Sequence, residues 1–91
     1  MIQSFKDPEA EKIFNGKRSR KYGAISKAAY RKLALLHSAA VLADLKSPGL
    51  SLEALKGDRT GQHSIRVNDR YRVCFVWADG KASNVEISGY H

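Results

Sequence analysis

The side chains that could do chemistry are concentrated in the last third of the chain, from LKGDRTGQHSIRVNDRYRVCFVW at residues 55–77 to the final GYH. Arginines and lysines there can hold phosphate, and His91 can move a proton because an imidazole titrates near neutral pH. Cleavage of RNA needs these groups, since RNA supplies its own nucleophile, the 2′-hydroxyl. Such a site aligns that hydroxyl, stabilises the extra phosphate charge and protonates the leaving oxygen, and this route requires no metal.

Five residues are the candidate catalytic groups, although each could instead be an ordinary solvated side chain. The planar guanidinium of Arg72 fits phosphate oxygens and would stabilise the charge of the transition state. Lys56 would supplement that charge or hold the RNA backbone. Tyr90 could stack on a base or orient the phosphate, while His91 would donate or accept the proton. Glu53 could act as the base, although basic surroundings make a carboxylate less basic.

Other cations are candidates for binding RNA or the ribosome. The net charge is +7, which favours an anionic partner such as nucleic acid or an acidic protein. The run KRSRK at residues 17–21 could be an electrostatic arm for RNA or a partner protein, or simply a solvated connector. The candidate RNA- or ribosome-binding residues are Arg59, Arg66, Arg70, Lys17, Arg18, Arg20 and Lys21.

The length of 91 residues predicts one domain over residues 1–91. The one cysteine, Cys74, lies in an apolar strand and is expected to be a buried hydrophobe in a reducing compartment. No stretch approaches the roughly 18 consecutive apolar residues of a membrane span, so we expect a cytoplasmic protein with no membrane partner. We also expect no metal and no cofactor, because His37, His63 and His91 share no ligand spacing.

The N-terminal half predicts one strand and two helices. Residues 1–5 are typical of a short strand, and Asp7-Pro8-Glu9 of a helix start, with the helix over 8–15 ending at Gly16. A longer amphipathic helix is predicted from Ile25 to Leu45, capped by Ser26. Its predicted inward positions are Ile25, Ala29, Leu33, Leu36, Ala40 and Ala43. His37 within it is expected to have a structural role.

The C-terminal half predicts a three-stranded meander over residues 62–67, 70–77 and 82–90, with turns at Asn68-Asp69 and Asp79-Gly80. In the middle strand Tyr71, Val73, Phe75 and Trp77 share one face and Arg70, Arg72, Cys74 and Val76 the other. Residues 50–55 are expected to form a loop or a helical turn, and His63 to point outward. The predicted class is α+β, two N-terminal helices packed on a small antiparallel sheet in the order β-α-α-β-β-β.

With these residues in view, the chain resembles the HigB-type toxins of the RelE/ParE superfamily. The resemblance rests on the string LKGDRxGxxSIRVNxxxR, on the final YH after a strand, and on the basic GKRSRK connector. It implies a RelE-like fold and an antitoxin encoded beside the toxin, a HigA-like helix-turn-helix protein. It also implies metal-independent cleavage of mRNA on the translating ribosome, with operator DNA contacted only through the antitoxin.

The resemblance also implies roles for particular residues. Arg72 matches the family arginine that faces the scissile phosphate, Lys56 falls in the basic loop, and Tyr90 and His91 match the catalytic C-terminal pair. At two positions the chain departs from the family. Gly89 stands where an aspartate is common, and Glu53 falls about where some relatives place a histidine.

Three functions are therefore compared. The first is a ribosome-dependent mRNA endoribonuclease that inhibits translation and is held in check by an antitoxin. The second is a ParE-like toxin that binds DNA gyrase without nuclease chemistry, and the third is a catalytically weak regulator that binds nucleic acid by charge alone. Arg72 with Tyr90 and His91 favours the first, because a gyrase inhibitor does not need them. Gly89 keeps the third open.

Overall fold

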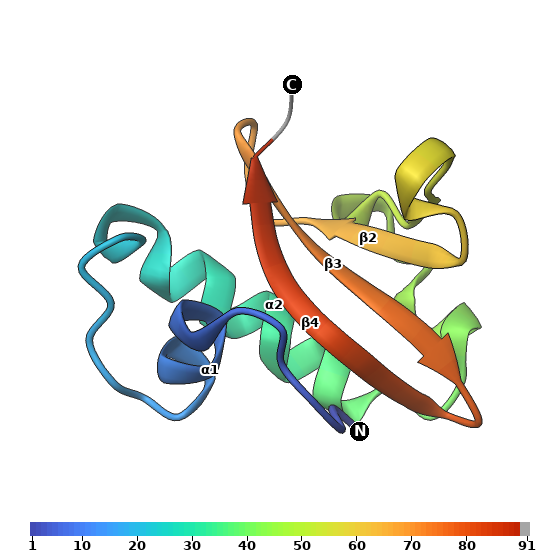
Figure 1. The fold of residues 1–91 in the computed structure, drawn as a ribbon, viewed down its shortest axis with the longest axis horizontal. Helices are drawn as coiled ribbons and strands as arrows, with labels where there is room; N and C mark the ends of the chain where they lie inside the picture. The colour runs from blue at the N-terminus through green and yellow to red at the C-terminus, as the bar shows by residue number, and fades with distance from the viewer. Residues whose placement is uncertain (90–91) are drawn as a thin grey trace.

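The structure, a computed structural model, describes residues 1–89, and Tyr90 and His91 lie outside the described residues. It has an α+β fold in which a four-stranded antiparallel sheet is ordered β1-β2-β3-β4 (Figure 1). The helices and strands are α1 (Pro8–Phe14), α2 (Ser26–Ser38), β1 (Glu53–Ala54), β2 (Gln62–Arg66), β3 (Tyr71–Ala78) and β4 (Lys81–Gly89). Short 3₁₀ turns occur at Gly23–Ile25, Leu42–Leu45, Pro48–Leu50 and Gly57–Arg59, and the last of these is called η4 below.

The first helix begins and ends at the predicted signals. The N–H of Glu9 donates to the Asp7 carboxylate over 2.9 Å, which caps a helix that starts at Pro8. Gly16 follows the helix with φ +76°, a left-handed conformation that glycine adopts at little cost. The second Asp7 oxygen accepts from the N–H of Ile87 at 3.4 Å, so this cap also ties α1 to β4.

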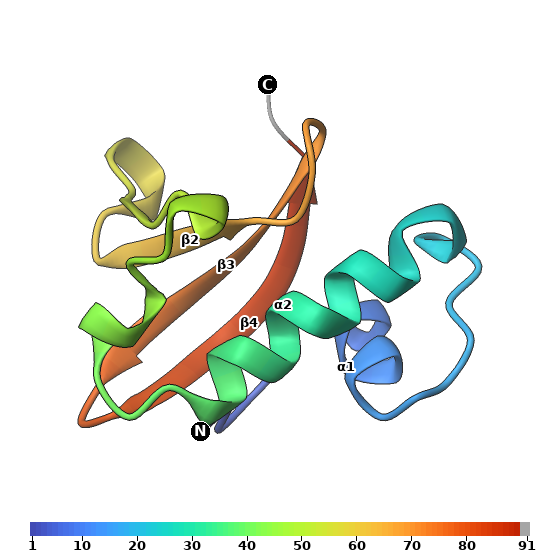
Figure 2. The ribbon, with the colours of Figure 1, turned by 180° about the vertical axis from the view of Figure 1, so that it is seen from behind.

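The helices cover one face of the sheet. Figure 2 shows α2 crossing that face with α1 beside it. The buried residues of α2, Ala29, Leu33 and Leu36, join one apolar cluster with Val73 and Phe75 of β3. Each large side chain buried in this way stabilises the fold by roughly 1.5–3 kcal/mol. The predicted apolar face of the middle strand is confirmed, since Val73 and Phe75 are inaccessible to solvent.

The hairpin turns fix which residues face which way. Asp79 and Gly80 have φ +53° and +74°, as the predicted two-residue turn between β3 and β4 requires. Between β2 and β3, the side-chain oxygen of Asn68 accepts from the N–H groups of Arg70 and Tyr71, both at 2.9 Å. These turns set the register that places Arg72 on the face away from the helices.

The predicted strand over residues 1–5 is wrong. This segment lies beside β4 but makes only isolated parallel bridges to it, through Ile2 and Phe5. Between the two bridges β4 is irregular, with Asn84 in the left-handed region at φ +53° and a register shift against β3. The shift interrupts a regular ladder. The observed order is therefore α-α-β-β-β-β within the predicted class.

The second helix is shorter than predicted. It ends at Ser38, because Ala39 is extended and the Asp44 carboxylate accepts from the N–H groups of Ala40 and Val41, at 2.9 and 3.1 Å. Those bonds start a separate 3₁₀ turn and leave Ala40 exposed. The backbone hydrogen bonds to Asp44 also hold the pKa of its carboxyl below the usual value.

The predicted cap of this helix is also wrong. Ser26 is the first helical residue rather than the cap, and its hydroxyl donates to the carbonyl of Tyr22 over 2.9 Å. Among the predicted inward positions, Ala43 is exposed like Ala40, and Ala39 and Leu45 are buried in their place.

His37 and His63 both pack against aromatic side chains. His37 accepts from the N–H of Ile2 at 3.1 Å and packs against Phe14, in agreement with the predicted structural role. His63 was predicted to point outward, and this is wrong. It lies opposite the buried Phe75 in the β2–β3 ladder and stacks on its ring, with centroids 6.2 Å apart. Directly opposed residues share a face, so His63 points toward the core side.

Candidate active site

A hollow of about 290 Å³ lies where β1 and η4 meet β3. It is lined by Glu53, Ala54, Leu55, Lys56, Arg59 and Arg72. Cross-strand pairing explains how Arg72 reaches it. Val73 pairs with Ile65 on β2 and Ile87 on β4, and all three are buried. In the next rung, Arg72 lies opposite Arg66 on β2 and Ser88 on β4. Since Val73 faces the helices, the alternation of a strand turns Arg72 to the other face.

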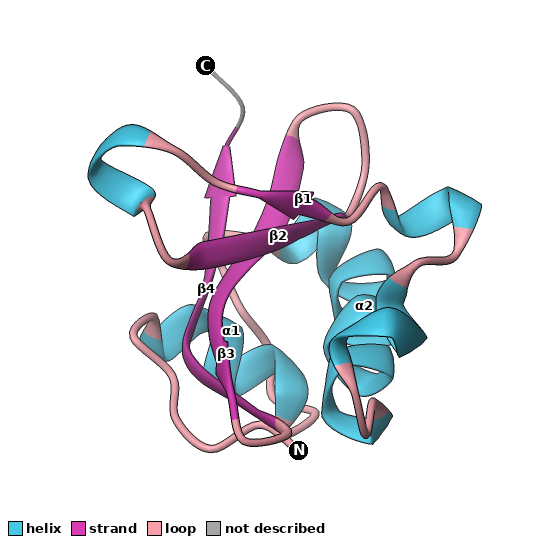
Figure 3. Ribbon diagram, turned by 90° about the vertical axis from the view of Figure 1, so that its right-hand side faces the viewer, coloured by secondary structure: helices cyan, strands magenta, loops and turns pink. Residues whose placement is uncertain are grey.

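The loop after β1 brings the remaining cations over this face. Leu55 closes β1 by donating to the carbonyl of Gln62 at 2.9 Å. Gly57 and Gly61 have φ +65° and +93°, conformations that other residues adopt only with strain. Figure 3 shows the resulting turn, η4, at upper left, with the strands between it and α2. The loop KGDRTG at residues 56–61 therefore folds back onto the sheet and forms one wall of the hollow.

Arg59 is the most tightly held cation of the hollow. Its guanidinium donates to Gln62 at 3.0 Å, to the Glu86 carboxylate at 3.2 Å and to the hydroxyl of Ser88 at 3.5 Å. The hydrogen bond to Glu86 raises the pKa of Arg59 above its already high value. Ser88 therefore joins Arg59 to the rung of Arg72, so two guanidinium groups share one wall.

Cys74 lies beneath these arginines and is completely buried. Burial raises the pKa of its thiol, and the positive charges of Arg59 and Arg72 oppose that rise only in part. A thiol held protonated in this way is a poor nucleophile. The prediction that Cys74 is a buried hydrophobe is confirmed. The groups that can bind an anion at this surface are the arginines Arg59 and Arg72.

No group of three or more His, Cys, Asp or Glu side chains within residues 1–89 is arranged to hold a metal ion. No helix formed by those residues has the length and apolar character needed to cross a bilayer. Among the described residues, the ionisable side chains that line the hollow are Glu53, Lys56, Arg59 and Arg72.

Comparison with known proteins identifies the family of this chain. A family profile described as the RelE-like toxin of the type II toxin–antitoxin system HigB matches residues 3–91. The chain belongs to this HigB-like toxin family. It is also 41% identical over 87 residues to Toxin HigB-1 of Vibrio cholerae serotype O1, an alignment that covers 92% of each chain. Membership of a type II system means that this HigB-like toxin has an antitoxin as its partner.

Three of the five candidate catalytic residues line the hollow of this HigB-like toxin. Arg72, Lys56 and Glu53 come together there, from β3, from the loop and from β1. The remaining two, Tyr90 and His91, lie outside the described residues. Residues 50–55 were expected to form a loop or a helical turn, and this is wrong for Glu53 and Ala54, which form β1. Two residues are too few to show an alternating pattern.

The candidate RNA-binding residues are divided among three places. Arg59 lies in the hollow. Arg66 has Arg72 as its cross-strand neighbour and is paired with Asp69, while Arg70 is exposed in the turn before β3. The basic run at residues 17–21 lies beyond the N-terminal helix, on the other side of the HigB-like toxin from η4 (Figure 1).

The basic run is anchored rather than a free connector. Ser19 at its centre is buried, donates to Glu9 at 2.8 Å and accepts from the N–H of Tyr22 at 3.2 Å. Its four cations are exposed around that anchor: Lys17, Arg18, Arg20 and Lys21. The hydrogen bonds from Lys12 and Ser19 hold the pKa of Glu9 below its usual value. The backbone of the run is therefore held at Ser19, while its cationic side chains are exposed on the surface of this HigB-like toxin.

Sequence reasoning missed the residues that hold Arg59. Glu86 and Ser88 alternate with Val85 and Ile87 in VEIS, a pattern that indicates a strand with a polar face. It does not indicate which cation that face receives. The partner, Arg59, comes from a loop 27 residues away in sequence, and only the fold of this HigB-like toxin shows that they meet.

Proposed function

We propose that this chain is a ribosome-dependent mRNA endoribonuclease that stops translation and is held in check by a HigA-like helix-turn-helix antitoxin. The observation that carries the proposal is the hollow in which Arg59 and Arg72 converge with Lys56. Three cations around one hollow suit the phosphodiester of RNA, whose charge grows in the transition state. Membership of the HigB-like family supports the same activity. The toxin would act in the cytoplasm, where it meets ribosomes, and would reach operator DNA only through the antitoxin.

Each residue has a role in the proposed reaction. Arg72 stabilises the charge of the scissile phosphate, and Lys56 holds the RNA backbone at the mouth of the hollow. The 2′-hydroxyl of the RNA attacks the phosphate, with Glu53 as a candidate to take its proton. His91 protonates the leaving 5′-oxygen, and Tyr90 stacks on a base or orients the phosphate. The reaction requires no metal.

Dependence on the ribosome follows from the weakness of the base. A carboxylate is a weak base toward a hydroxyl, and Glu53 is exposed, so the free toxin does not hold it against the 2′-hydroxyl. A ribosome that holds the mRNA in a cleavable conformation contributes the alignment of the 2′-hydroxyl. Orientation of reacting groups can supply several kcal/mol, on the order of 7–11 kcal/mol in favourable cases.

The first prediction concerns cells. Induction of the toxin without its antitoxin arrests growth and stops translation, and mRNA is cut within coding regions. Mapping of transcript 5′ ends after induction checks this result. Purified toxin should cut mRNA on translating ribosomes and leave the same RNA nearly intact when ribosomes are absent.

Three results would contradict this function. Equal cutting of naked and ribosome-bound RNA would remove the ribosome from the proposal. Intact transcripts together with inhibited DNA gyrase would assign the chain to the gyrase-inhibitor class of toxins. Growth arrest with neither effect would leave a protein that binds nucleic acid without cutting it.

The second prediction concerns Gly89. The backbone there is outside the left-handed region, and an added Cβ would meet the carbonyl oxygen of Arg70 at 3.6 Å and the Tyr71 ring at 3.9 Å. These are ordinary contacts, so Gly89→Asp should fold. The new carboxylate can orient a neighbouring cation or hydroxyl. A side chain also restricts the backbone, and the smaller loss of conformational entropy on folding stabilises the strand by roughly 0.5–1 kcal/mol relative to glycine. We expect single-turnover cleavage on programmed ribosomes to rise several-fold.

Gly89→Ala is the matched control. Alanine restricts the backbone as aspartate does but has no carboxylate. A rise with Asp and none with Ala assigns the effect to the carboxylate, whereas equal rises assign it to backbone order. A folded Gly89→Asp protein, checked by thermal melt, whose rate equals or falls below that of the parent would show that Gly89 does not limit this site.

A further inference from the structure

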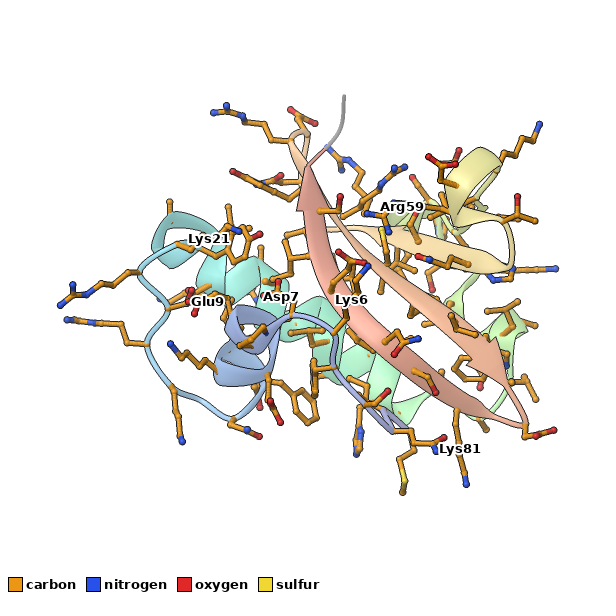
Figure 4. All side chains as sticks on the ribbon, viewed as in Figure 1. Lys6, Asp7, Glu9, Lys21, Arg59 and Lys81 are labelled. Carbon is orange, nitrogen blue, oxygen red and sulfur yellow. The ribbon has the colours of Figure 1, made fainter. Side chains whose placement is uncertain are left out.

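Glu86 is a half-buried carboxylate that none of the proposed catalytic roles uses. Its side chain is 16% exposed and lies on the same face of the sheet as Arg72. One of its oxygens accepts from Arg59 at 3.2 Å and lies 3.5 Å from the ammonium of Lys6. Figure 4 shows Lys6 and Arg59 beside β4, although they come from distant parts of the sequence. The same carboxylate therefore joins the N-terminal segment to the loop that forms the hollow.

The three partners of Arg59 differ in what they contribute. Gln62 and Ser88 are neutral acceptors, whereas Glu86 is a carboxylate, so of these three partners it alone pairs an opposite charge with the guanidinium. The side chain of Arg59 is 30% exposed, so it keeps access to solvent and to a ligand in the hollow. Without a fixed acceptor, a side chain on the loop beyond β1 would be free to choose other rotamers.

The neighbouring charges give Glu86 a second effect. Arg59 and Arg72 line the same hollow, and like charges at close range repel each other. Glu53, the carboxylate at the rim, is exposed, whereas Glu86 is partly buried and in direct contact with Arg59. The Glu86 charge therefore offsets the repulsion where solvent screens least.

We propose that Glu86 is a positioning residue, which holds the Arg59 guanidinium beside Arg72 so that the two arginines clamp one phosphate of the RNA backbone. This inference rests on the proposed nuclease function and names a residue that the function alone does not require. Glu86 does not touch the substrate. It acts through Arg59, by fixing where the remaining N–H donors point.

The test uses two substitutions of Glu86 and one control. Glu86→Asp keeps the charge and withdraws the carboxylate by one methylene, whereas Glu86→Gln keeps the length and removes the charge. Lys6→Gln removes the other cation that contacts Glu86 and leaves Arg59 untouched. If Glu86 acts by position, single-turnover cleavage on programmed ribosomes falls about 10-fold in Glu86→Asp, since small misplacements of aligned groups are expensive. Lys6→Gln cleaves like the parent.

Ribosome affinity and three outcomes of the cleavage assay discriminate between explanations. Affinity for the ribosome should stay within about 2-fold of the parent value in Glu86→Asp, because a positioning defect acts on the cleavage step. In an Arg59→Ala background the same substitution should add less than about 2-fold, since its target is already absent. A full additional loss in that background would overturn the proposal. So would a Glu86→Asp protein that is fully active, or a Lys6→Gln protein that is equally impaired.

A binding measurement separates this inference from the nuclease function. Titration of the free toxin with inorganic phosphate, followed by the arginine Nε–H resonances, reports Arg59 and Arg72 individually. In the parent both resonances respond together. In Glu86→Asp and Glu86→Gln the affinity for phosphate reported by the Arg59 resonance weakens roughly 5-fold, as loss of about one hydrogen bond between Arg59 and the phosphate predicts. If the parent cuts no RNA, the nuclease function fails, and an unchanged Arg59 response in both variants still overturns the role of Glu86.

Discussion

Arg72→Ala should lower single-turnover cleavage on programmed ribosomes by about 100-fold or more, the loss that follows removal of one donor from a preorganised anion site. Arg72 lines the hollow from the middle of β3, with hydrogen-bonded strands on both sides. The strand backbone that carries this side chain is therefore held in place. The guanidinium needs little reorganisation when the phosphate becomes more negative. Toxicity in cells should fall with the rate.

The Arg72→Ala protein should remain folded and bind its antitoxin. Arg31→Ala is the matched control, because Arg31 is an exposed arginine on α2, away from the hollow. A thermal melt and an antitoxin pull-down establish that both variants are intact. Toxicity of Arg72→Ala equal to that of Arg31→Ala at equal abundance would show that the hollow is not where cleavage occurs.

The sheet of this HigB-like toxin could be predicted because its residues alternate. Along β3, apolar Val73 and Phe75 alternate with Arg72 and Cys74, and a strand places alternate residues on opposite faces. Asp79-Gly80 then fixes the hairpin. Arg72 was consequently assigned to the correct face from its neighbours in sequence alone.

The errors arose where no local pattern exists. The two residues of β1 are recognised as a strand only through their pairing with Ser64 and His63. The helix was extended beyond Ser38 because alanines at positions 40 and 43 continue its period, whereas the Asp44 carboxylate captures the backbone of the next turn. Both outcomes depend on one contact that competes with propensity, and a periodicity does not contain it.

For the candidate site as well, some residues could be assigned from the sequence, whereas the contacts between them could not. Lys56 and Arg72 were assigned because they match family positions, and Arg59 was named as a candidate RNA-binding residue. What brings these cations to one hollow is the path of the loop between Gly57 and Gly61, with positive φ at each end. Glu86, which holds Arg59, is separated from it by 27 residues and gave no signal as a partner.

The last prediction concerns the basic run at residues 17–21. We expect that Lys17, Arg18, Arg20 and Lys21 bind ribosomal RNA, since all are exposed around the anchored Ser19. Each phosphate that the run neutralises adds about 0.9 to the slope of log affinity against log salt, so four such phosphates account for a loss on the order of 100-fold between about 50 and about 200 mM salt. Neutralising the four cations should remove that part of the slope.

The fold should tolerate the four substitutions, because the anchor of the run is Ser19 and not a cation. Lys46→Gln with Lys81→Gln is the control, as both lysines are exposed and Lys81 lies far from Lys21 (Figure 4).

The measurement is ribosome affinity over a series of salt concentrations, with antitoxin binding measured in parallel. Neutralisation of the run should reduce the slope by about one for each phosphate that the toxin no longer binds. A slope equal to that of the control would exclude the run from the ribosome interface, and a selective loss of antitoxin binding would assign it to the toxin–antitoxin interface.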